Sequence, residues 1–307
     1  MNTFSRREFI KTTGLASMAS IGFSFNTIKK SKPLLSFSTL GCPDWTFKSI
    51  VGFAKANGYD GLELRGILRE LDLLKCPEFN NTENIRASRK LMEDNGLQFV
   101  NLGSSTNLHQ PEGEGRKKQI DDGKRFIDLA HQIGCPFIRV FPNNFPKDQE
   151  RTATLELISN GLIELGNYAK DSNVKVLMET HGEVVYTADI EKIMKTAEHP
   201  QVGLIWDALN MWTMTKESPS MVYEKLKKYI FHTHIKNATL LNDKISYVLL
   251  EKGDVPIFEA IDALTKGGYH GYYSFEWEKL WHPEIESPEI ALADYPKAMT
   301  NHFNKSK

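Results

Sequence analysis

The sequence predicts an α/β protein made of a single (β/α)8 TIM barrel, and three observations support this fold class. Eight short apolar runs of the buried-strand type recur along the chain. Amphipathic stretches of helical length lie between them, and several end on a glycine that suits a helix C-cap. The eight units occupy about 270 residues, which is a typical size for one such barrel.

The predicted elements alternate in the order strand, helix, strand. We expect strands at residues 34–40, 61–65, 98–104, 137–143, 174–180, 202–210, 230–237 and 272–278. Between them we expect helices at residues 47–59, 85–97, 123–135, 153–173, 187–199, 220–229 and 256–269. An open doubly wound sheet is the main alternative. No GxGxxG motif follows the first strand to support it.

The first 32 residues carry a different kind of signal. Arg6 and Arg7, followed by Phe9 and Lys11, precede a run of small and apolar residues. This pattern resembles a twin-arginine export signal, although an arginine pair can also open an ordinary surface helix. We therefore expect an export segment at 1–32, a barrel domain at 33–307 and a periplasmic protein. The apolar run is too short for stable membrane insertion after export.

Composition excludes several classes of partner and site. The net charge is −1 and no long Lys/Arg run follows the N-terminus, so we expect no nucleic-acid partner. Cys42, Cys76 and Cys135 are an odd set without a CxxC motif. This argues against a disulfide framework or a thiolate zinc site, and we expect three small buried side chains. A homo-oligomer remains open.

Four predicted strands in the second half of the chain end on metal-ligand residues. These are Glu179, Asp207, His234 and Glu276, at intervals of 28, 27 and 42 residues. Because the carboxyl ends of barrel strands meet at one mouth, the simplest explanation is one divalent ion. A mostly oxygen donor set suits Mn²⁺ or Mg²⁺ and tolerates Co²⁺ or Zn²⁺. His232 shares a strand face with His234 and is an alternative ligand.

Five segments in order resemble one known family. They read GYDGLELRG (58–66), METHG (178–182), WDALN (206–210), HTHIKN (232–237) and GYYSFEWE (271–278). Together they are similar to the sugar phosphate isomerase/epimerase family, with its xylose isomerase-like barrel, from about residue 34 to residue 304. The resemblance implies one ion, commonly manganese, on Glu179, Asp207, His234 and Glu276. It also implies that the two glutamates transfer the proton.

Two departures limit what the resemblance says about substrate. Relatives often read WDxxH where this chain has Asn210, which can hydrogen-bond a hydroxyl group but cannot carry a proton. They often read HxHxKD where this chain has Asn237, an amide in place of an acid. The resemblance therefore says more about the type of reaction than about the substrate.

Further side chains are candidates for substrate binding. His181 shares a face with Glu179, and either contacts substrate or donates a hydrogen bond to that glutamate. Lys236 could neutralise an enolate or carboxylate, or form a salt bridge. Trp45 could form an apolar wall for a sugar ring. Glu63 and Arg65, at the end of the second strand, are a candidate ion pair.

These features predict an enzyme with a small-molecule substrate. The leading hypothesis is a metal-dependent isomerase or epimerase that removes an α-proton through an enediolate on a sugar or sugar derivative. An alternative is a lyase or hydrolase-like enzyme that uses the same step on a 3-keto-glycoside to expel the aglycone. A hypothesis of another class is a sugar-binding protein whose ion is only structural.

Overall fold

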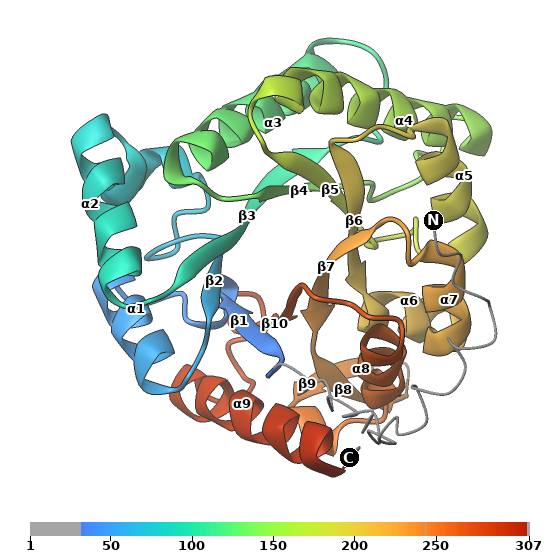
Figure 1. Ribbon diagram of the computed structural model, residues 1–307. Helices are drawn as coiled ribbons and strands as arrows, with labels where there is room; N and C mark the ends of the chain where they lie inside the picture. Colours follow the sequence, from blue (N-terminus) through green and yellow to red (C-terminus); the bar gives the residue numbers. More distant parts are fainter. Residues whose placement is uncertain (1–31, 243, 306–307) are drawn as a thin grey trace, which may run out of the picture. The chain divides into compact units, whose positions relative to one another are not determined.

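The computed structural model describes residues 32–242 and 244–305, which form one closed barrel of parallel strands (Figure 1). The ring order is β1-β10-β7-β6-β5-β4-β3-β2, with β1 paired to both β10 and β2. The barrel strands are β1 (Leu34–Ser38), β2 (Gly61–Leu64), β3 (Gln98–Asn107), β4 (Phe137–Phe141), β5 (Lys175–Glu179), β6 (Val202–Asp207), β7 (Ile230–Ile235) and β10 (Tyr272–Phe275). The predicted fold class is confirmed. The predicted export signal lies outside the described residues.

Helices surround the barrel, and each predicted helix is present. They are α1 (Phe47–Ala56), α2 (Thr82–Asp94), α3 (Glu114–Ile133), α4 (Arg151–Tyr168), α5 (Thr187–Thr196), α6 (Ala208–Thr215), α7 (Pro219–Leu226), α8 (Ile257–Lys266) and α9 (Pro288–Lys305). Gly134 follows α3 with φ +74°, the left-handed conformation expected of a glycine C-cap. The sequence interpretation missed α6, which begins inside the predicted strand 202–210, and α9.

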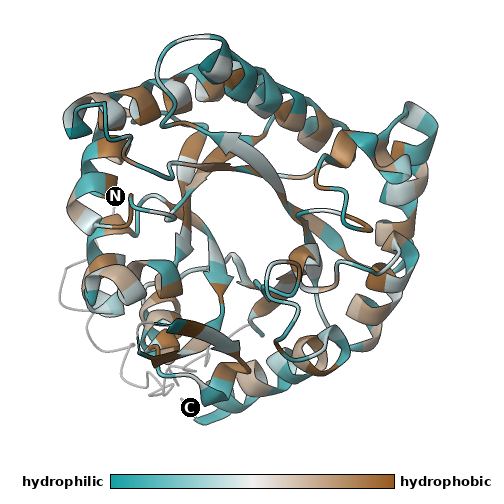
Figure 2. Ribbon diagram, turned by 180° about the vertical axis from the view of Figure 1, so that it is seen from behind, coloured by the Kyte–Doolittle hydropathy of each residue, from teal (hydrophilic) through white to brown (hydrophobic). Residues whose placement is uncertain are grey.

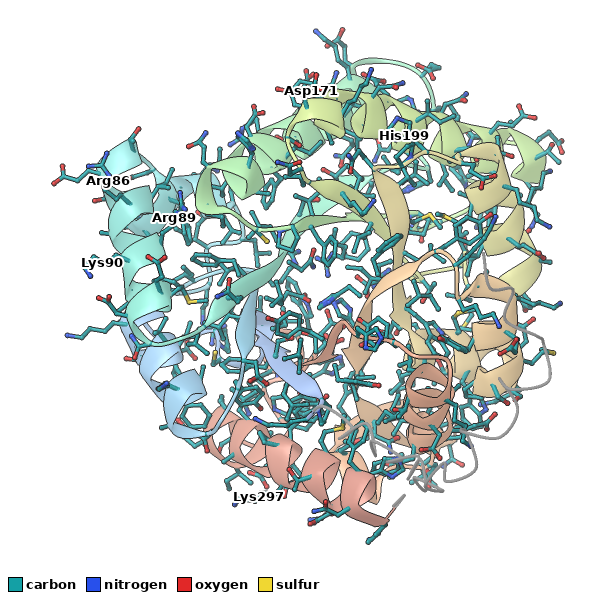
Figure 3. The ribbon with its side chains drawn as sticks, viewed as in Figure 1. Arg86, Arg89, Lys90, Asp171, His199 and Lys297 are labelled. Carbon is teal, nitrogen blue, oxygen red and sulfur yellow. The ribbon has the colours of Figure 1, made fainter. Side chains whose placement is uncertain are left out.

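The helices pack one apolar face on the strands. In α8 the buried side chains Ile257, Ala260, Ile261 and Leu264 follow the spacing of one helical face. Apolar and polar residues accordingly alternate along the outer helices in Figure 2. On the outside, Lys90 of α2 and Lys297 of α9 point away from the barrel (Figure 3).

A two-stranded hairpin interrupts the alternation after β7. Its strands are β8 (Asn237–Leu241) and β9 (Lys244–Val248), paired antiparallel. The Asn237 amide donates to the Leu250 carbonyl and accepts from the backbone N–H groups of Ala238 and Val255. The hairpin was not predicted, because its short strands NATLL and KISYV mix polar and apolar residues and neither is the continuous apolar run by which the barrel strands were recognised.

Cys42, Cys76 and Cys135 are free thiols and all are buried, as expected. Burial raises the pKa of the Cys135 thiol to about 12, so this thiol is un-ionised at neutral pH. Among the residues that the structure describes, no helix is both long and apolar enough to cross a bilayer.

Candidate metal centre

Four side chains from adjacent strands converge at the carboxyl end of the barrel. Glu179 ends β5, Asp207 ends β6, His234 lies near the end of β7 and Glu276 directly follows β10. One ligand atom of each lies within 4.8 Å of the other three, and all four side chains are buried. His234 Nδ1 lies 3.1 Å from Glu179 Oε1 and 3.2 Å from Glu276 Oε2. The structure therefore brings together the four predicted ligands.

The two carboxylate oxygens of Asp207 differ, because one accepts a backbone hydrogen bond and the other accepts none from the described residues. It is the N-cap of α6, because its Oδ1 accepts a hydrogen bond of 2.9 Å from the backbone N–H of Asn210. Its Oδ2 is buried and has no aligned hydrogen-bond donor in the described part of the chain, although Lys236 Nζ lies 2.9 Å away. A fixed, buried anionic oxygen with free lone pairs fits a metal ligand.

Lys236 lies among carboxylates beside the cluster. Its Nζ is 2.6 Å from Glu276 Oε2 and 2.6 Å from Glu278 Oε1. Burial alone lowers the pKa of an ammonium group, but the nearby acids outweigh it and hold the pKa of Lys236 well above its usual range. The centre of the Tyr247 ring, on β9, lies 5.8 Å from Lys236 Nζ, so the hairpin covers this ammonium group. Lys236 therefore forms the salt bridge that was one of its two predicted roles, and Glu278 is a partner that was not predicted.

Arg139 on β4 is a second buried cation of the site, and the sequence interpretation missed it. Its Nη1 lies 3.0 Å from Glu179 Oε2 and 3.6 Å from Glu276 Oε1. Its guanidinium stacks 4.1 Å from the centre of the Phe141 ring. A signal was available, because an arginine inside the apolar run FIRVF needs a buried acid as partner.

Arg65 and Glu63 do not form the predicted pair. Arg65 donates to the Gly103 carbonyl and to Ser105 Oγ. Burial and the neighbouring Arg139 lower the pKa of Arg65 to about 9. Glu63 turns to the histidines instead, because those imidazoles lie inside the barrel, where a carboxylate needs a donor.

Glu63 contacts two imidazoles at once. Its Oε2 lies 2.9 Å from His232 Nε2, and both its oxygens lie 3.1 Å from His234 Nε2. Burial favours the neutral acid, but the imidazoles outweigh it and hold the pKa of Glu63 below its usual range. His232 is therefore engaged by Glu63, and His234 is the histidine that joins the four-residue cluster.

The buried charges at this end of the barrel fit one divalent ion. Every buried carboxylate of the described chain gathers here: Glu63, Glu179, Asp207, Glu276 and Glu278. Three buried cations accompany them: Arg65, Arg139 and Lys236. With His234 neutral, as a metal ligand must be, the acids outnumber the cations by two, which is the charge that one divalent ion supplies. Uncompensated buried charge is costly, so the donor set and the charge balance agree.

The predicted substrate-binding residues lie around this centre with different partners. His181 Nδ1 lies 2.8 Å from Asn143 Oδ1, so this nitrogen contacts an amide and not Glu179. The Asn210 side chain donates to the Thr180 carbonyl at 3.3 Å. Trp45 is half-buried and packs against Phe53 of α1, with ring centres 4.9 Å apart. Contact of these three with substrate stays a prediction.

Asn237 has a structural role that the sequence interpretation did not foresee. Its amide both donates and accepts hydrogen bonds with backbone groups of the hairpin and the following segment. An ionised aspartate could only accept, so it could not make the bond to the Leu250 carbonyl. A Cβ on Gly253 would lie 2.2 Å from Asn237 Cγ, which shows how tightly this segment packs.

Comparison with protein families identifies one family that matches most of this chain. The family model described as xylose isomerase-like TIM barrel matches residues 51–294. The chain belongs to this family.

Two curated relatives of this barrel are dehydratases. An inosose dehydratase of Clostridium botulinum (strain Alaska E43 / Type E3) is 24% identical over 281 residues, which cover 80% of this chain and 91% of the relative. A 3-dehydroshikimate dehydratase of Bacillus anthracis is 22% identical over 226 residues, which cover 70% and 78% of the two chains.

Two solved structures share the fold of this barrel. A crystal structure of the IOLI protein with a bound zinc atom has a TM-score of 0.74 at 17% identity, covering 89% of this chain and 98% of that one. The 3-keto-D-glucoside 4-epimerase of E. coli has a TM-score of 0.70 at 15% identity, covering 88% and 100%. At these identities the likeness shows the fold alone.

Proposed function

We propose that this protein is a divalent-metal-dependent enzyme that removes the proton next to the carbonyl of a hydroxylated ketone, and thereby isomerises or epimerises a sugar derivative. The observation that carries the proposal is the buried cluster of Glu179, Asp207, His234 and Glu276. Three carboxylates and one imidazole suit Mn²⁺ first, with Mg²⁺, Co²⁺ and Zn²⁺ as alternatives. A bound ion would polarise the substrate carbonyl and make the neighbouring C–H more acidic.

Glu179 and Glu276 are the groups that transfer the proton. They come from β5 and from the end of β10, with β6 and β7 between them, so they approach a substrate from different sides. One carboxylate removes the proton and the other returns a proton to the opposite face, which inverts the carbon. Arg139 holds Glu179 Oε2 at 3.0 Å and Lys236 holds Glu276 Oε2 at 2.6 Å, so both carboxylates are oriented.

The charge of the site favours an uncharged substrate. With one divalent ion, the buried acids and cations at the mouth balance, so an added carboxylate or phosphate would carry an uncompensated negative charge into a buried site. A neutral polyhydroxy ketone adds none. This favours a keto-sugar or an inosose-like ring over an acid such as dehydroshikimate.

One observation favours a second candidate, elimination in place of epimerisation. Lys236 Nζ lies within hydrogen-bond distance of Glu276 and Glu278, next to the proposed base. After a carboxylate takes the α-proton, the Lys236 ammonium at this place would donate a proton to the oxygen that leaves from the adjacent carbon. A C–O bond then breaks, a C=C bond forms, and water or an alcohol departs. The names of the two curated relatives are in line with this outcome.

Proton exchange with solvent tests the proposal. Manganese-loaded protein is incubated in D₂O with neutral keto-sugars, 3-keto-glycosides and the matching uronates, and NMR follows the α-position. An isomerase or epimerase incorporates deuterium, and a lyase releases water or an aglycone. Glu179→Gln and Glu276→Gln should each lower turnover by about 10²–10⁴ while metal stays bound. Metal-dependent sugar binding without exchange on any substrate would instead support a binding protein.

We also propose that the chain is exported to the periplasm before it acts. The support is the Arg6-Arg7 pair with its flanking residues and the charge-free run that follows. Replacing both arginines with lysine should leave the precursor in the cytoplasm, as fractionation and immunoblotting would show. Normal periplasmic amounts of the double variant would contradict export by this route.

A further inference from the structure

We infer that Glu63 is a positioning residue of the metal centre, which holds the Nε2 proton of His234 and so directs Nδ1 to the ion. The inference rests on the proposed metal centre, and it adds a residue from the first half of the barrel. Glu63 comes from β2, whereas His234 comes from β7, and β1 and β10 lie between them in the ring. The carboxylate therefore reaches across the barrel interior.

The two nitrogens of His234 face different neighbours. Nδ1 lies 3.1 Å from Glu179 Oε1 and 3.2 Å from Glu276 Oε2, which are proposed ligands. Nε2 lies 3.1 Å from each oxygen of Glu63. A neutral imidazole carries one proton, so coordination through Nδ1 requires that the proton stay on Nε2. Glu63 is the acceptor for that proton, and a carboxylate acceptor also makes the ring a stronger ligand.

His232 secures Glu63 from a second direction. Its Nε2 lies 2.9 Å from Glu63 Oε2, a normal hydrogen-bond distance. Glu63, His232 and His234 are fully buried, so water does not compete for these bonds. A carboxylate fixed by two imidazoles cannot rotate away from His234 without leaving a donor unpaired.

A second ion between Glu63, His232 and His234 is the alternative use of this group, since the three also lie close enough to share one. It would require His234 to ligate two ions at once. Both ring nitrogens would then have to be free of protons, which a neutral imidazole does not allow. One ion, with Glu63 as a proton acceptor, needs no such step.

Metal affinity and the protonated ring nitrogen test the inference. The proteins are wild type, Glu63→Gln, Glu63→Asp and the matched control Ser274→Ala, which removes a buried hydroxyl from the same layer. Zn²⁺ dissociation constants come from chelator competition, and ion stoichiometry comes from elemental analysis. The visible spectrum of the Co²⁺ form reports the ligand field. Nitrogen-15 NMR of the wild-type Zn²⁺ form reports which nitrogen of His234 carries the proton, and it requires no variant.

We expect one ion per chain and a His234 proton on Nε2 in the wild type. Glu63→Gln should weaken Zn²⁺ binding about 10- to 100-fold and change the Co²⁺ spectrum, because an amide is a weaker acceptor. Glu63→Asp should recover part of the affinity. Ser274→Ala should stay within about twofold of wild type, since the contact of Ser274 Oγ with Glu63 Oε2 is long, at 3.5 Å.

Different outcomes would overturn the inference and the proposed function. A His234 proton on Nδ1, two ions per wild-type chain, or wild-type affinity in a folded Glu63→Gln would overturn the role of Glu63. A wild-type protein that retains no divalent ion would instead overturn the proposed metal centre. An Asp207→Ala variant that retains as much ion as the wild type would also overturn the proposed metal centre, whatever the results for the Glu63 variants.

Discussion

The two halves of the barrel contribute differently to its buried charge. In the second half, β5, β6, β7 and β10 each bring a side chain into the candidate metal cluster. In the first half, β2 and β4 bring Glu63 and Arg139, which contact those side chains and lie outside the four-residue set. The second half brings the four proposed ligands, and the first half brings side chains that contact them.

This difference shows why a ligand set alone does not make a site. Each proposed ligand has a second polar atom that also needs a partner in a buried environment. Arg139 donates a hydrogen bond to Glu179 Oε2, and Glu63 lies within hydrogen-bond distance of His234 Nε2. Because a barrel of eight strands is narrow, side chains from one half reach the other across its interior. The proposed metal centre thus depends on side chains from both halves.

The largest expected effect is the loss of a ligand from the second half. Asp207→Ala should abolish retention of the ion, because the ion then loses one carboxylate ligand and the negative charge that this ligand carries. It should also cost about 1 kcal/mol of stability, since Asp207 caps α6. Asp207→Asn is the control, because an amide oxygen can still cap. Elemental analysis and thermal unfolding measure both effects, and full occupancy in Asp207→Ala would contradict the assignment.

Loss of a supporting cation from the first half should act mainly on the metal-free protein. Arg139→Gln leaves Glu179 buried without its ion-pair partner, at a cost of about 3–5 kcal/mol in unfolding free energy. A bound ion supplies the missing charge, so the loss should be smaller in the loaded protein. Arg139→Lys keeps the charge and should lose less. Equal destabilisation with and without the ion, by denaturant titration, would show that Arg139 serves packing only.

Apolar core substitutions should affect both halves alike. Leu64 on β2 and Leu204 on β6 are both fully buried. Each change to alanine should cost about 2–5 kcal/mol, from lost burial and the cavity that remains. Neither should alter the metal dissociation constant. A weakened affinity in Leu64→Ala alone would indicate that the first half positions the ligands through its packing as well as through its charges.

The smallest expected effect concerns the rim of the first half. If Trp45 forms a wall for the sugar ring, Trp45→Leu should raise the Michaelis constant about 2- to 10-fold, the usual worth of one aromatic contact, with metal affinity unchanged. Phe53→Leu is the matched control, because it alters the same packed pair and keeps the indole. Steady-state kinetics decide, and equal effects of the two changes would contradict a direct contact.

Most of the architecture could be predicted from local pattern. The barrel strands are apolar runs bounded by turn residues, and buried parallel strands need that pattern whatever their partners. The convergence of the four proposed ligands of the second half could be predicted too, because each one lies at the end of such a run. The β8–β9 hairpin and α6 could not. The hairpin strands are short and mix polar and apolar residues, and α6 begins at Ala208, directly after β6, without an intervening turn.

By itself, the sequence determined the order of the strands around the barrel and the chemical type of the four proposed ligands. Only the tertiary structure decided the partners: Glu63 with His232 and His234, Arg139 with Glu179, and Lys236 with Glu278. The reason is physical. Strand and helix patterns depend on neighbouring residues, whereas a buried charge pairs with whatever group the closed barrel brings within a few ångströms, and Glu63 and His234 are 171 residues apart.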